Sequence, residues 1–65
     1  MSNDNDAYVV VADGKPSDPF DWSTAMTRAK HLGQFRGQHV KVHLVRNGKT
    51  VRIEAEWKNF EQVKG

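Results

Sequence analysis

The chain of 65 residues contains no cysteine, which excludes a disulfide, a thiolate zinc site and a cysteine nucleophile. It also has no hydrophobic run near the ~20 residues that a membrane-spanning helix requires. Residues 1–6 are polar and include two aspartates, unlike the basic and apolar start of a secretory signal. We therefore expect one small domain that acts in the cytoplasm and does not enter a membrane.

Acidic residues are missing from the middle of the chain. Residues 22–53 contain seven Lys and Arg but no Asp or Glu, whereas residues 1–21 contain five Asp against one Lys. The formal net charge of +2 hides this asymmetry, which is informative about partners rather than about the fold. The predicted partner-binding residues come from this basic segment: Arg28, Arg36, Lys41, Arg46, Lys49 and Arg52.

The first half of the chain predicts a strand followed by a helix. Residues 7–12 are β-branched and aromatic, as in a strand, and residues 15–19 hold both prolines and form a loop. Asp21 is a suitable N-cap for a helix over residues 22–32, and Gly33 would end it. At 100° per residue, the apolar side chains of this helix share one stripe: Trp22, Ala25, Met26, Ala29 and Leu32.

The second half predicts a β-hairpin over residues 39–57. Asn47-Gly48 is the preferred dipeptide of a two-residue type I′ turn, because both positions require positive φ. With this turn, every apolar pair of the two strands falls on one face of the hairpin. The expected apolar pairs are Leu44–Val51, Val42–Ile53 and Val40–Ala55, with Trp57 closing the face. On the other face we expect Lys41–Glu54, His43–Arg52 and His39–Glu56.

Together these elements predict an α+β fold of β-α-β-β order, with one helix packed on one face of a three-stranded sheet. We expect the first strand at an edge, antiparallel to the last strand of the hairpin. Residues 1–6 are expected to be a disordered tail, residues 7–57 the domain, and residues 58–65 a frayed tail or a short helical turn.

The first strand is apolar on both faces, so an uncovered edge there would be prone to pairing. If Val9 and Val11 face the helix, Tyr8 and Val10 face outward, and these two are the predicted self-association residues. A homodimer, a C-terminal tail that folds back, or a larger partner would each cover this strand.

No constellation of residues predicts catalysis. His39 and His43 would lie about 13 Å apart along one strand, too far to share a metal ion. Gly14-Lys15 lacks the upstream glycine of a phosphate-binding loop, and no serine has a base predicted beside it. We expect no catalytic, metal-binding or cofactor-binding residue and no small-molecule substrate. Trp22 and Trp57 lie on the predicted core stripes and are expected to be buried.

The leading hypothesis is a small, non-enzymatic regulatory or inhibitory protein whose basic surface binds an acidic surface of a larger protein. The size and charge layout are typical of accessory proteins of phages and mobile elements, although no motif identifies one. A nucleic-acid-binding module that uses the same cations on phosphates is the runner-up. A structural homo-oligomerisation domain is the third hypothesis.

Overall fold

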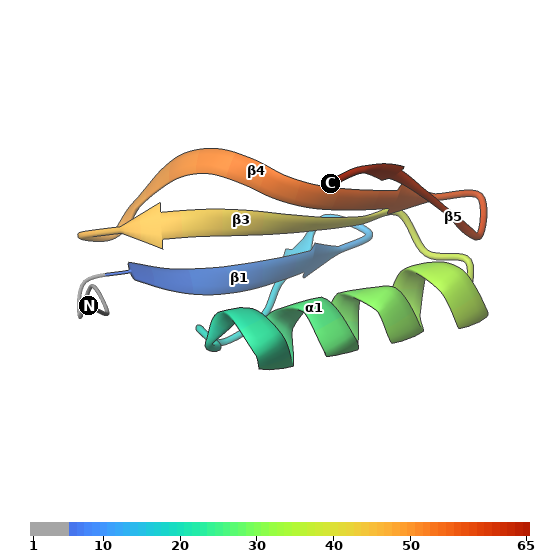
Figure 1. Ribbon diagram of the computed structural model, residues 1–65, viewed down its shortest axis with the longest axis horizontal. Coiled ribbons are helices and arrows are strands. Elements are labelled where there is room, and N and C mark those ends of the chain that lie inside the picture. Colours follow the sequence, from blue (N-terminus) through green and yellow to red (C-terminus); the bar gives the residue numbers. More distant parts are fainter. Residues whose placement is uncertain (1–5) are drawn as a thin grey trace.

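Five antiparallel strands and one α-helix make up residues 6–65, the part of the chain that the computed structural model describes (Figure 1). The α+β class is confirmed, but the sheet has five strands rather than three. None of the described helices is long and apolar enough to cross a membrane. In chain order the elements are β1 (Asp6–Ala12), β2 (Lys15–Pro16), α1 (Trp22–Lys30), the π-helical turn η1 (His31–Phe35), β3 (Val40–Arg46), β4 (Lys49–Lys58) and β5 (Glu61–Lys64).

The strand order is β2-β1-β3-β4-β5, so the expected pairing of the first strand with the last strand of the hairpin is wrong. The chain turns back directly after β1, and this turn explains the order. β2 pairs with the end of β1, and Tyr8 and Phe20 exchange backbone hydrogen bonds of 2.9 and 2.8 Å. α1 then runs in the same direction as β1 and delivers the chain to the start of β3 (Figure 1). The outer edge of β1, which the sequence left open, is covered by the chain itself.

The face of β1 that packs against the helix carries Tyr8, Val10 and Ala12, so the predicted assignment of faces is reversed. Val10 is 1% exposed, too deeply buried for its predicted place in a self-association surface. Val9 and Val11 lie on the opposite face. The alternation in β1 did not decide between the two faces, because both sets of side chains are apolar.

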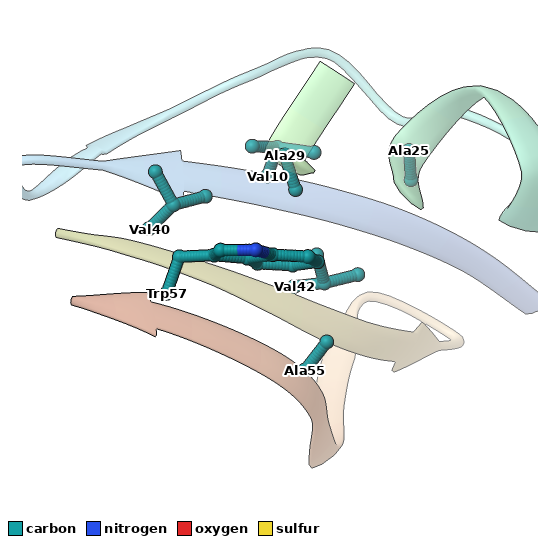
Figure 2. Packing of buried hydrophobic residues seen from close by; sticks show 7 residues of the cluster. All are labelled: Val10, Ala25, Ala29, Val40, Val42, Ala55 and Trp57. Atoms are coloured by element: carbon teal, nitrogen blue, oxygen red, sulfur yellow. The ribbon is translucent and has the colours of Figure 1, made fainter. Parts of the chain in front are cut away.

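Small residues on α1 let the helix lie close to the sheet. Ala25 and Ala29 are fully buried, and Trp57 from β4 fills the space between the two layers (Figure 2). Gly33 is buried beside that indole, and a Cβ at this position would lie 2.2 Å from the Cβ of Trp57. Close packing, rather than the end of the helix, therefore requires glycine here. The remaining buried members of this core are Val10, Val40, Val42 and Ala55.

The helix begins as predicted, but α1 ends at Lys30, before the predicted end at residue 32, and the chain continues as the π-helical turn η1. Asp21 Oδ1 accepts a hydrogen bond of 2.8 Å from the Thr24 amide. The predicted end at Gly33 is wrong, because the chain continues as η1 to Phe35 and the positive φ of 71° falls on Gly37.

Only one of the two tryptophans lies in the core. Trp57 is 2% exposed, as predicted, but Trp22 is 53% exposed. Phe20, one residue before the helix cap, packs against the core beside Tyr8 and takes the place expected for Trp22.

The β3–β4 hairpin turns at Asn47-Gly48 as predicted, with both residues at positive φ. The predicted register is wrong beyond the first two pairs, because two irregularities place extra residues in β4. The side chains of His39 and Glu56 are hydrogen-bonded, although the ladder places Glu56 opposite Lys41. The observed pairs are Leu44–Arg52, His43–Ile53, Val42–Ala55, Lys41–Glu56 and Val40–Trp57. The shift brings the indole into the core and leaves Val51 49% exposed.

The C-terminal segment forms a strand, so the expected frayed tail or helical turn is wrong. β5 pairs with the end of β4 through a two-residue turn, Asn59-Phe60, in which both residues have positive φ (55° and 66°). At the other terminus Asp6 already belongs to β1, and the expectation for residues 1–5 lies outside the described residues.

Candidate binding surface

Two of the predicted binding arginines form ion pairs near the β3–β4 turn. Arg46 donates to both carboxylate oxygens of Asp6, with Nε–Oδ1 and Nη2–Oδ2 distances of 2.6 and 3.1 Å. Arg52 Nε lies 2.5 Å from Glu54 Oε2. Hydrogen bonds to these carboxylates raise the pKa of both arginines. Lys49 forms no ion pair within residues 6–65, but the two arginine pairs leave this end of the molecule with less positive charge than the sequence predicted.

Two other predicted cations lie on different surfaces. Lys41 is on the sheet face away from the helix, directly opposite Glu56 in the β3–β4 ladder. Arg28 is on α1, where its guanidinium lies 5.2 Å from the centroid of the Phe20 ring, within the range of a cation–π contact. The six predicted residues therefore do not form one surface.

Cations without ion pairs gather where η1 meets the β4–β5 turn. Arg36, a predicted residue, follows η1, Lys30 ends α1 and Lys58 ends β4. None of these three forms an ion pair with another residue in the described range 6–65. Glu61 lies opposite Lys58 in the β4–β5 ladder, but no ion pair joins them. Because η1 packs against both β4 and β5, these charges share one end of the molecule.

Two exposed aromatic side chains lie at the same end. Phe35 and Phe60 are 69% and 59% exposed. The Phe60 ring lies on Gly37, where an added Cβ would be 2.4 Å from Cζ. The Phe35 ring faces the His31 imidazole at a centroid distance of 5.7 Å. We call this surface the basic-aromatic end and define it by Lys30, His31, Phe35, Arg36, Lys58 and Phe60.

The backbone that carries both phenylalanines is unusual. Phe35 is the last residue of a π-helical turn, a conformation frequent at functional sites. Phe60 has a φ of 66°, which is costly for a residue with a bulky side chain. Neither phenylalanine was a predicted binding residue, since Phe35 lies between the predicted helix and hairpin, and Phe60 lies in the C-terminal segment whose structure was left open. The only local signal was Asn59, a residue type that tolerates positive φ.

The ionised groups favour the folded state at neutral pH. The hydrogen bond from Arg46 lowers the pKa of Asp6, and the bond with His39 lowers the pKa of Glu56. The hydrogen bonds from Thr24 lower the pKa of Asp21 at the helix cap. Within residues 6–65, no group of three or more His, Asp or Glu is placed to hold a metal ion, and the His39–Glu56 pair offers two ligands at most.

Comparisons with models of protein families, with curated proteins and with solved structures found no match for this chain. The geometry of the basic-aromatic end therefore provides the basis for a functional proposal.

Proposed function

We propose that the chain is a small, non-enzymatic regulatory protein that binds an acidic surface of a larger protein through the basic-aromatic end. The observation that carries this proposal is the meeting of two exposed phenylalanines with three cations that form no ion pair among the described residues 6–65. The proposal places the protein in the cytoplasm, where a chain without cysteine needs no oxidising compartment to fold.

The cations and the aromatic rings have different roles in this proposal. Lys30, Arg36 and Lys58 attract an acidic partner, which raises the association rate and makes binding weaker at high salt. Phe35 and Phe60 supply affinity, because burying apolar surface contributes about 25 cal/mol per Å². Aromatic residues and arginine are enriched in the buried centres of protein interfaces.

The opposite end of the molecule is the weaker candidate. A partner that recruited Arg46 or Arg52 there would have to compete with Asp6 and Glu54. Breaking such an ion pair has a small cost in free energy, a cost that does not arise at Lys30, Arg36 and Lys58, which form no ion pair within residues 6–65.

Affinity capture from a lysate of the source cells tests the proposal, with nuclease treatment and at low and high salt. One variant alters the basic-aromatic end by Phe35→Ser, Arg36→Glu and Phe60→Gly. The control variant reverses the charges of Arg46, Lys49 and Arg52, and circular dichroism must show that both are folded.

We expect the wild type and the control to retain the same nuclease-resistant protein, which the first variant loses. Retention by the first variant with loss by the control would refute the proposed location of the site.

Single-stranded nucleic acid is the second candidate, and the exposed rings of Phe35 and Phe60 favour it. Bases stack on aromatic side chains with about 1–3 kcal/mol each, and nearby cations neutralise phosphates. Fluorescence anisotropy with a labelled oligothymidine distinguishes this candidate from the first. Tight binding whose log–log salt slope falls after Arg36→Glu would favour nucleic acid over protein.

A further inference from the structure

The sheet face away from α1 has an apolar centre. This face carries Val9 and Val11 from β1, Val45 from β3 and Ile53 from β4. In the ladders Val9 and Ile53 both lie opposite His43, and Val11 lies opposite Lys41. All four side chains are partly exposed. Both described helices pack on the opposite side, where Ala25, Ala29 and Gly33 are buried. Within residues 6–65, no helix covers this face.

An antiparallel sheet with one solvated face normally alternates apolar residues inward with polar residues outward. β1 departs from this pattern, since the side chains from Ala7 to Ala12 are apolar on both faces apart from the Tyr8 hydroxyl. A face of this kind fits a second layer better than it fits water.

The charges on this face suit a second layer made of another copy of the chain. Glu56 Oε2 lies 2.6 Å from His39 Nε2, and Glu56 is opposite Lys64 in the β4–β5 ladder. In the β3–β4 ladder its neighbour is Lys41, directly opposite, so these two groups carry opposite charges. A partner surface of a single charge sign would match one of these groups and repel the other. A copy of the same face carries both signs and can match both groups at once.

We propose that two copies of the chain stack through this face in a homodimer. The two-fold axis lies between the two sheets, parallel to the strands and level with the gap between β3 and β4. The rotation sets Lys41 of each copy opposite Glu56 of the other, and His43 opposite Ile53. Stacked sheets lie about 10 Å apart, a gap that lysine and glutamate side chains span from the two sides. Of the residues that define the basic-aromatic end, Lys58 lies on this face, two residues from Glu56 along β4. The other five lie on α1, on η1 or in the connecting segments, outside the strands of this interface.

A mixing experiment tests this geometry. Lys41→Glu gives a face with two acidic groups, and Glu56→Lys gives a face with two basic groups. Each variant alone places like charges across the interface, so we expect its dissociation constant to rise by roughly tenfold or more. An equimolar mixture places Glu against Lys at every contact and should associate like the wild type. Mixing cannot repair a charge pair within one chain, so recovery reports contacts between chains.

Sedimentation equilibrium supplies the readout, with circular dichroism to confirm folding. We expect the wild type to approach twice the 7.4 kDa mass of one chain as its concentration rises. Phe35→Ser is the matched control, because it removes an exposed apolar group outside the interface and should leave association unchanged. A wild type that stays monomeric up to about 1 mM would overturn the proposal on its own. A mixture that fails to recover association would do the same.

Discussion

Gly33 fixes the distance between the helix and the sheet, because the β-carbon of any other residue would overlap Trp57. Replacing glycine by alanine inside an exposed helix normally stabilises a protein by roughly 1 kcal/mol. For Gly33→Ala we predict the opposite sign, a loss of about 1–3 kcal/mol typical of an overpacked core. Urea unfolding measures this change. Gln34→Ala, at an exposed position of the same turn, should change stability little, and a Gly33→Ala protein as stable as the wild type would contradict the packing.

Acid should destabilise the protein through three carboxylates. The folded pKa values of Asp6, Asp21 and Glu56 lie below their ordinary values of 3.8, 3.8 and 4.5. The stability that these groups contribute is therefore fully present above about pH 5 and is lost as pH falls through the folded values. Asp21→Asn keeps a good helix cap and removes one titrating group. Its melting temperature should match the wild type at pH 7 and fall less steeply below pH 4, and an unchanged slope would argue against the cap.

The turn between β4 and β5 holds an aromatic residue in a conformation that suits glycine. Phe60→Gly recreates the Asn-Gly pair of the other hairpin and removes a cost of about 1–2 kcal/mol for a side chain at positive φ. We expect a net gain of roughly 0.5–1 kcal/mol, since glycine also gives more freedom to the unfolded chain. Chemical denaturation measures the gain, and Phe35→Ala, at a more exposed site, should be nearly neutral. A large loss of stability would show that the ring is structural.

The elements whose form depends on local chemistry were predictable from the sequence. Asp21 caps α1 and Asn47-Gly48 turns the β3–β4 hairpin, because the residue types at those positions leave few alternatives. The ladder beyond the turn was not predictable, since its register depends on how Trp57 fits against Gly33 in another element. The side of β1 that faces the core was likewise decided by the sheet, not by its own apolar pattern.

At the scale of the whole molecule, the basic character was visible in the sequence but its distribution was not. Asp6 pairs with Arg46 across forty residues of sequence, and this contact removes charge from the predicted surface. Arg36 was among the predicted candidates, whereas Lys58 lies outside the basic segment and reaches the same end only through the fold. The exposure of Phe35 and Phe60 depends on η1 and on the β4–β5 turn, and neither element was predicted.

The measurement that tests the basic-aromatic end most directly is an NMR titration of the 15N-labelled protein with a short polyglutamate peptide. The proposed function predicts that the amide shifts concentrate in residues 30–37 and 58–61 and disappear at high salt. Shifts concentrated in residues 46–52, or spread evenly over all cations, would contradict it.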